Sequence, residues 1–204
     1  MLNPAATQSV FCSSLERLLD VSCETGSGHR RTPSAAFPGF AQQFGGAENL
    51  APYIPTPEAV VEKMLQAGHV KPGDVVYDLG SGDGRVIIMA AQKFGATGVG
   101  VELLPDLCRK TQQRIASLGL ADRVRMVEGS ALRVDLSPAN VVTMFFTTLS
   151  NERLKPNLEK HLKPGSRVVS NEFPVRGWKP VEVAHVKTGS MDHTIFVYEI
   201  GRLR

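Results

Sequence analysis

The distribution of apolar and polar positions divides the chain at about residue 50. Residues 1–50 show no sustained period of 2 or 3.6, apart from a short helix-like stretch at 14–21. We interpret them as a disordered or weakly ordered extension. In the alternative interpretation they form a lid that folds over a bound ligand, with Phe37, Phe40 and Phe44 as its apolar contacts.

From residue 51 onward, short apolar strands alternate with helical patterns. The run Val141–Phe146 lacks polar alternation, as strands buried on both faces require. The predicted strands cover 74–79, 96–101, 124–128, 141–146 and 167–171, the predicted helices cover 56–67, 85–94, 105–118 and 156–162, and a closing hairpin joins 181–187 to 194–200. This alternation predicts one α/β domain over residues 51–204, a doubly wound parallel sheet with helices on both faces.

Prolines mark where the chain is expected to enter its helices. Three prolines make residues 51–57 a stiff, extended strap, because each fixes its own φ and disfavours helical geometry in the residue before it. Thr56 is then expected to cap the first helix, with Pro57 at its first position. By the same rule, Pro156 is predicted to open the helix 156–162.

The composition is that of a soluble globular protein, with 42% hydrophobic and 21% charged residues among 204. No apolar run approaches the roughly 20 residues that a membrane-spanning helix needs, and residues 1–6 do not resemble a secretory signal. The three cysteines contain no CxxC pair, which predicts neither a disulfide framework nor a metal site. We therefore expect a cytoplasmic protein without a metal.

The net charge gives little support to a nucleic-acid partner. Residues 1–50 hold three basic and four acidic residues, so the overall charge of +3 leaves +4 on the remainder. This surplus is too small to indicate nucleic acid by itself. Arg109, Lys110 and Arg114 give one helix a mildly basic face, which solvation explains.

A glycine-rich loop connects the first predicted strand to the following helix. Its sequence is Asp78-Leu79-Gly80-Ser81-Gly82-Asp83-Gly84. In open α/β sheets, ligands bind at this place, and glycines let the backbone approach them closely. In the alternative interpretation, the loop only makes a tight turn from the strand to the helix. The strict alternation of glycines favours a ligand site.

A dinucleotide is the obvious competing ligand for this loop. The spacing is GxGxG instead of GxGxxG, and Asp78 and Asp83 flank it. Two carboxylates beside a helix N-terminus would repel a pyrophosphate. A ligand with cationic groups and no phosphate fits better, and S-adenosylmethionine, with its ammonium and sulfonium, is such a ligand.

The next two strand ends supply groups for a nucleoside. Glu102 ends the second strand, 22 positions after Gly80, and a carboxylate can accept hydrogen bonds from both ribose hydroxyls. We predict Glu102, with Leu103 beside it, as the ribose anchor; an exposed strand-end acid is the alternative. After the third strand, an adenine edge is expected to lie near Gly129, Ser130 and Ala131.

These motifs resemble those of the seven-stranded class I S-adenosylmethionine-dependent methyltransferases. The wider resemblance rests on the glycine loop, Glu102 and Leu162-Lys-Pro-Gly-Ser-Arg-Val-Val. A narrower one, to the archaeal broad-specificity protein lysine methyltransferases and their mitochondrial animal relatives, rests on Pro52-Tyr-Ile-Pro-Thr-Pro-Glu, Val141-Val-Thr-Met-Phe, Leu154-Lys-Pro-Asn-Leu-Glu-Lys and His193-Thr-Ile. It implies a Rossmann-like sheet in the order 3-2-1-4-5-7-6 with strand 7 antiparallel.

The resemblance also implies a function, the transfer of methyl groups from S-adenosylmethionine to exposed lysines of protein substrates. Residues 1–50 lack the apolar anchor typical of the animal members, so we expect no membrane attachment. Two alternatives stay open: a methyltransferase that acts on a small molecule or RNA, and a binding module without catalysis. The segment 145–149 lacks an Asn-Pro-Pro-Tyr motif, which by analogy disfavours adenine and glutamine acceptors.

The same resemblance implies further site residues. The strap is expected to cross the cofactor through Tyr53, Thr56 and Pro57, and Phe145 is expected to reach it from the fourth strand. Apolar walls would lower the pKa of an acceptor lysine by desolvation, and the candidate walls are Tyr53, Phe145, Phe146, Phe173 and Trp178. Tyr53, Asn171 and Glu172 are the catalytic candidates. The last two follow from their place at a strand's carboxyl end, where they are expected either to accept hydrogen bonds from an incoming amine or to have a capping or structural role. His193 is interpreted as a hairpin residue instead of a base.

Overall fold

A computed structural model of the chain describes residues 48–204. The strands are β1 (Val75–Leu79), β2 (Thr97–Glu102), β3 (Val124–Glu128), β4 (Val141–Met144), β5 (Arg167–Asn171), β6 (Glu182–Thr188) and β7 (Met191–Glu199). The helices are α3 (Glu58–Ala67), α4 (Arg85–Phe94), α5 (Pro105–Ser117) and α6 (Thr148–His161). The predictions for residues 1–47, including the helix-like stretch at 14–21 and the aromatic lid, lie outside the described residues.

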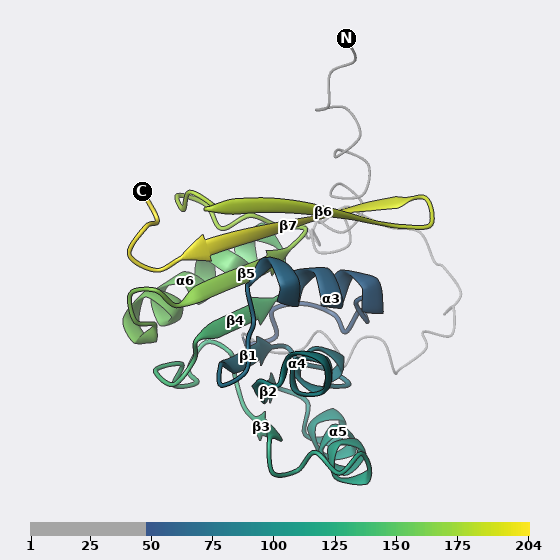
Figure 1. The fold of residues 1–204 in the computed structure, drawn as a ribbon. Coiled ribbons are helices and arrows are strands. Elements are labelled where there is room, and N and C mark those ends of the chain that lie inside the picture. The colour runs from purple at the N-terminus through teal and green to yellow at the C-terminus, as the bar shows by residue number, and fades with distance from the viewer. Residues whose placement is uncertain (1–47) are drawn as a thin grey trace, which may run out of the picture. The chain divides into compact units, whose positions relative to one another are not determined.

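The seven strands form one sheet in the order β3-β2-β1-β4-β5-β7-β6 (Figure 1). β1 to β5 run parallel, whereas β7 is antiparallel to both β5 and β6. The predicted order and the antiparallel seventh strand are confirmed. The carboxyl ends of β1, β2, β4 and β5 consequently meet at one edge of the sheet, where the glycine loop lies.

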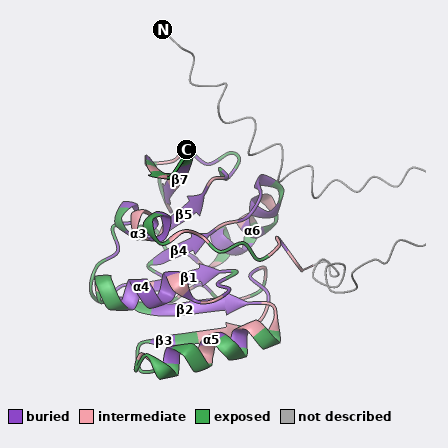
Figure 2. Cartoon of the chain, turned by 90° about the vertical axis from the view of Figure 1, so that its right-hand side faces the viewer, coloured by how far each residue is buried: buried purple, intermediate pink, exposed green. Residues whose placement is uncertain are grey.

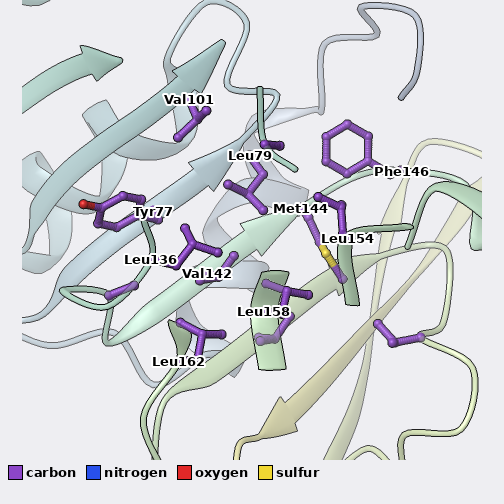
Figure 3. Close-up of a cluster of buried hydrophobic side chains, with 14 of the residues drawn as sticks. Tyr77, Leu79, Val101, Leu136, Val142, Met144, Phe146, Leu154, Leu158 and Leu162 are labelled. Carbon is purple, nitrogen blue, oxygen red and sulfur yellow. The ribbon is translucent and has the colours of Figure 1, made fainter. Parts of the chain in front are cut away.

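Helices cover both faces of the sheet, as predicted. α3 and α4 pack on one face, where α5 joins α4, and α6 packs on the other. Neighbouring positions of β1 point to opposite faces: Val76 packs with α3 and α4, whereas Tyr77 and Leu79 pack with Leu154 and Leu158 of α6 (Figure 3). Because both faces are covered, the strand has no polar alternation.

Burial is greatest in the central strands and much lower on the outer helix α5. β1, β4 and β5 are almost wholly buried, whereas α5 buries only Cys108, Thr111 and Ile115 (Figure 2). Leu50, at the end of the predicted extension, packs into the cluster under α6, and its carbonyl accepts the Ser150 hydroxyl at 2.6 Å. Within residues 48–204, no helix combines the length and apolar character needed to cross a bilayer.

The prediction for α6 is wrong at its start. The helix begins at Thr148, and Pro156 lies in its interior instead of at its first position. Thr147 caps the helix by accepting a backbone N–H with its hydroxyl at 3.3 Å. Proline removes one intrahelical hydrogen bond, and the burial of Leu154 and Leu158 beside it holds the helix against the sheet.

Other boundaries differ by smaller amounts, and three of these differences concern α3, β4 and β7. α3 begins at Glu58, and Pro57 occupies the cap position without a side-chain hydrogen bond, so Thr56 does not cap the helix. β4 ends at Met144, because the chain leaves the sheet before the two phenylalanines that follow. β7 begins earlier than predicted, at Met191, because polar residues at its start interrupt the apolar pattern.

Candidate functional site

The glycine loop turns sharply at the carboxyl edge of the sheet, between β1 and α4. Gly80, Gly82 and Gly84 have φ angles of +71°, +56° and +74°, in the left-handed region that residues with a Cβ disfavour. The N–H groups of Gly80 and Ser81 donate to the carbonyl of Val101 at 2.9 and 3.0 Å. The loop thereby folds across the end of β2, and this backbone path requires the alternating glycines.

Aromatic rings pack directly on the loop. A Cβ added to Gly82 would lie 2.3 Å from Cε2 of Tyr53, and one added to Gly80 would lie 2.9 Å from Cζ of Phe146. Both distances are shorter than a van der Waals contact, so an alanine at either position would require the facing ring to move. The strap, through Tyr53, and the segment after β4, through Phe146, therefore enclose the loop from two sides.

Glu102 is a buried, oriented carboxylate at the end of β2. Its exposed fraction is 7%, which rules out the alternative of an exposed strand-end acid. Oε2 accepts the N–H of Gly82 at 2.9 Å, and Oε1 accepts the N–H of Leu104 at 3.0 Å. A carboxylate offers about four acceptor positions, so this group keeps free lone pairs for the hydroxyls of a ribose.

Asp78 is a buried carboxyl group in a negative environment. Burial raises its pKa to about 7, and the neighbouring charges of Glu102 and Asp83 act in the same direction. The hydroxyl of Thr143 on β4 donates a hydrogen bond to Asp78 Oδ1 at 2.7 Å and offsets part of the shift. A cationic ligand group at this position would stabilise the ionised carboxylate.

Asp83 is paired with basic side chains, in contrast to Asp78. Nε and one terminal nitrogen of Arg85 donate to its carboxylate at 2.9 and 2.7 Å, and Arg114 lies 3.4 Å away. Burial would raise the pKa of Asp83, but the hydrogen bonds and charge of Arg85, with Arg114, lower it below its ordinary value. The two buried carboxyl groups at this edge of the sheet are therefore Asp78 and Glu102.

Arg85 also ties the strap to the loop. Its second terminal nitrogen donates to the carbonyl of Thr56 at 2.6 Å. One guanidinium thus links Thr56 of the strap, Asp83 of the loop and the start of α4. This link holds Tyr53 over Gly82, so the position of the strap depends on a charged pair inside the loop.

The nucleoside side of the site includes the residues after β3. Ser130 and Ala131 are buried, and the N–H of Gly129 donates to the carbonyl of Glu102 at 2.9 Å. The hydroxyl of Ser130 accepts the N–H of Leu132 at 3.3 Å. The ends of β2 and β3 are therefore held together, as the prediction for an adenine edge requires.

A pocket of about 360 Å³ opens between the strap and the start of α5. Its lining combines aliphatic and aromatic groups with two charged ones: Tyr53, Leu104, Pro105, Asp106, Leu107 and Lys110. The pocket follows Glu102 directly along the chain. Leu103 is half-buried there, whereas the side chain of Leu79 belongs to the core, so only its backbone is available at the loop (Figure 3).

The other end of the site is aromatic. Phe145, after β4, stacks on Phe173, after β5, with ring centroids 6.2 Å apart. Asn171 and Glu172 lie at the same strand end, and Asn171 is 1% exposed. Trp178 does not join this wall, because it packs edge-on against Tyr198 in the core cluster under α6.

Comparison with known proteins identifies the family. Residues 78–182 match the family model of the ANTKMT methyltransferase domain, which spans half of the chain. The chain belongs to this methyltransferase family. A protein-lysine N-methyltransferase of Saccharolobus islandicus is 52% identical over 151 residues, which cover 74% of this chain and 94% of that protein.

Two further relatives of this methyltransferase are informative. Adenine nucleotide translocase lysine N-methyltransferase of Mus musculus is 30% identical over 73% of this chain and 63% of its own length. The crystal structure of an RNA methyltransferase from Salinibacter ruber in complex with S-adenosyl-L-homocysteine superimposes with a TM-score of 0.67 at 40% identity, covering 72% of this chain and 94% of that one. The cofactor of this methyltransferase is S-adenosylmethionine.

The residues present fit this cofactor. Asp78 offers a buried carboxylate to a cationic group, Glu102 offers oriented lone pairs to hydroxyls, and the glycines of the loop between them carry no side chain that would keep a ligand from the backbone. Within residues 48–204, no cluster of three or more His, Cys, Asp or Glu side chains is arranged to hold a metal ion. The cofactor-binding assignments of individual residues remain predictions.

Some candidate residues carried no usable signal in the sequence. Arg85 and Thr143 resemble ordinary helix-start and strand residues, and their partners lie 29 and 65 positions away. Leu104 and Pro105 follow a strand without a motif of their own. For the pocket residues other than Tyr53, the position directly after Glu102 was the only available signal.

Replacing Arg85 with methionine is expected to weaken cofactor binding about 3- to 10-fold, because the strap loses its hydrogen bond at Thr56 and its link to Asp83. Calorimetric titration with S-adenosylmethionine measures the change. Arg109→Met is the matched control, since Arg109 is exposed and pairs with Asp106 on its own helix. Equal affinities in the two variants would disprove the role of Arg85.

Proposed function

We propose that this methyltransferase modifies lysine side chains of proteins. The observation that carries the proposal is the 52% identity to a protein-lysine N-methyltransferase across 94% of that protein. The mouse adenine nucleotide translocase lysine N-methyltransferase, at 30% identity, agrees with it. The substrates of this chain would be proteins with exposed lysines.

The aromatic end of the site suits a lysine acceptor. A free lysine has a pKa of about 10.4, and only its neutral form has a lone pair for attack. Transfer from water to the surroundings of Phe145, Phe146 and Phe173 disfavours the charged form and lowers this pKa. The walls would therefore prepare the nucleophile without a strong general base.

In this mechanism, most of the remaining rate enhancement comes from aligning the lysine nitrogen with the methyl carbon and the sulfur of the cofactor. When bound, S-adenosylmethionine supplies an electrophilic methyl group: the lysine nitrogen forms a bond to its carbon as the carbon–sulfur electron pair returns to sulfur. Asp78 and Glu102 would hold the two polar ends of the cofactor, and Tyr53 and Phe146 would exclude water from the loop. Holding two reactants in line contributes roughly 7 to 11 kcal/mol in favourable cases.

A second candidate function is methylation of RNA. The observation in its favour is the 40% identity to a structure described as an RNA methyltransferase. The net charge of +3 argues against it, because binding to RNA depends on neutralising phosphates. We therefore favour protein lysine as the acceptor.

Labelling separates the two candidates. Purified protein, methyl-labelled S-adenosylmethionine and a whole-cell extract are incubated, and mass spectrometry locates the label. We expect label on lysines, in material that ribonuclease leaves intact and protease destroys. Label confined to RNA would refute the lysine proposal and leave the methyltransferase assignment standing. A parallel reaction with Asp78→Ala controls for enzymes of the extract.

A further inference from the structure

The acidic residue that follows β5 has an unusual backbone. Glu172 has a φ of +63°, and within residues 48–204 it shares a positive φ with only one other non-glycine residue, His69. Its N–H donates to the carbonyl of Thr194 at 2.7 Å, and the next N–H, of Phe173, donates to the carbonyl of Asn171 at 2.8 Å. Non-glycine residues kept in this region cluster at binding and catalytic sites.

The side chain of Glu172 is held by a chain of hydrogen bonds. His193 of β7, 7% exposed, places Nδ1 2.5 Å from Glu172 Oε1, and its Nε2 lies 2.6 Å from the hydroxyl of Thr188 on β6. A carboxylate only accepts hydrogen bonds, so Nδ1 donates to Glu172, and in the neutral imidazole Nε2 accepts a hydrogen bond from the Thr188 hydroxyl. Three strands therefore fix one carboxylate in one orientation.

One oxygen of this carboxylate is left for a ligand. Among residues 48–204, Oε2 of Glu172 has no hydrogen-bond partner, although the side chain is only 18% exposed. The adjacent Asn171 has a buried Oδ1 without a partner in the described chain. Buried acceptors are normally satisfied, so this orphaned oxygen beside the Glu172 carboxylate indicates a missing donor at the strand end.

The carboxyl end of β5 lies where a methyl-accepting lysine is expected to enter the site. β5 neighbours β4, which neighbours β1, so the strand that Glu172 follows lies two strand spacings, about 10 Å, from the strand that leads into the glycine loop. The Phe145–Phe173 stack lies at the ends of β4 and β5, on the same edge of the sheet. A side chain that passes over this stack has the glycine loop on one side and Glu172 on the other.

We infer that Glu172 binds the acceptor: Oε2 accepts a hydrogen bond from the lysine nitrogen and directs its lone pair toward the methyl group. His193 is the positioning residue that orients Glu172, instead of the plain hairpin residue that the sequence predicted. A lysine has the donors that this acceptor pair lacks. The inference rests on the proposed function and adds the residue that recognises its substrate.

The test measures kinetics with a peptide that contains the most strongly labelled lysine of the extract experiment. Glu172→Gln keeps an oxygen for His193 but removes the charge, and it is expected to lower kcat/KM about 10- to 100-fold, mainly through KM. Binding of S-adenosylmethionine and the thermal midpoint should stay unchanged. Glu199→Gln, at the opposite end of β7, is the charge-matched control and should behave as wild type.

His193 is tested by a pair of variants. His193→Asn retains a donor toward Glu172 and should keep most of the activity, whereas His193→Leu removes it and should raise KM as Glu172→Gln does. A purely structural role would instead lower the thermal midpoint of both His193 variants with little change in KM.

The outcomes separate the two proposals. Wild-type protein that labels no lysine refutes the proposed function and this inference with it. Wild-type protein that labels lysine while Glu172→Gln keeps its KM and kcat refutes the inference alone. A Glu172→Gln protein that loses affinity for S-adenosylmethionine also refutes it, because the residue would then serve the cofactor.

Discussion

Replacement of Gly82 by alanine is expected to weaken cofactor binding by at least about 100-fold. The added methyl would stand 2.3 Å from the ring of Tyr53, and the φ of +56° disfavours any residue with a Cβ. Relief of the overlap requires the Tyr53 ring to move off the loop or the loop to lose its turn. Loss of the turn would also separate Glu102 from the Gly82 N–H that orients it.

Gly119→Ala is the matched control for this variant. Gly119 has a φ of +69° but nothing within 4 Å of an added Cβ. It should lose about 1 kcal/mol of unfolding free energy from backbone strain and bind the cofactor normally. Calorimetry gives the affinities and chemical denaturation gives the stabilities. If Gly82→Ala binds within a few-fold of wild type, the cofactor does not lie on this loop.

The sequence predicted the part of the site that depends on local backbone chemistry. The glycines at alternate positions, Asp78 and Glu102 lie where strand ends meet at one edge of a parallel sheet, and the structure brings them together. Their positions follow from the order of strands and the direct strand-to-helix turn. No long-range side-chain contact had to be known.

The sequence did not predict the contacts that depend on register and packing. His193 meets Glu172 because β7 pairs antiparallel with β5, with Asn171 opposite Ile195. A shift of one residue would turn His193 to the other face of the sheet. A polar residue in a hairpin gives no sign of this, and for that reason His193 was interpreted as a hairpin residue.

The prediction of where α6 begins was wrong for a related reason. Proline at a helix start is a local preference, and it placed the boundary at Pro156. The structure shows that burial of Leu154 and Leu158 against the sheet outweighs the lost hydrogen bond within the helix. Tertiary packing therefore decided a boundary that local preference had assigned.

Cofactor affinity is expected to depend on pH through Asp78. The pKa of this carboxyl is about 7 in the free protein, raised chiefly by burial, and a cationic ligand binds its ionised form. Below pH 7 the proton must leave before binding, so the dissociation constant should rise by up to about tenfold per pH unit between pH 7 and pH 5. Calorimetry across this range measures the slope.

Asp78→Asn is the isosteric control for this slope. It cannot carry the charge, so it should bind weakly at every pH and lack the extra dependence, while any titration of the cofactor itself stays the same. A wild-type slope equal to that of Asp78→Asn would contradict the assignment of Asp78 to the cationic part of the cofactor.

The same shift predicts an opposite effect on the stability of the free protein. The carboxyl has a pKa near 3.8 when unfolded and about 7 when folded, so the folded state binds the proton more tightly. Stability from this group is therefore full below pH 3.8, falls as the pH rises toward 7 and is constant above it. Asp78→Asn should have nearly wild-type stability at pH 4 and be more stable than wild type at pH 8. The residue predicted to hold the cofactor thus destabilises the free enzyme at neutral pH, and bound cofactor should raise the melting temperature of wild type far more than that of the variant.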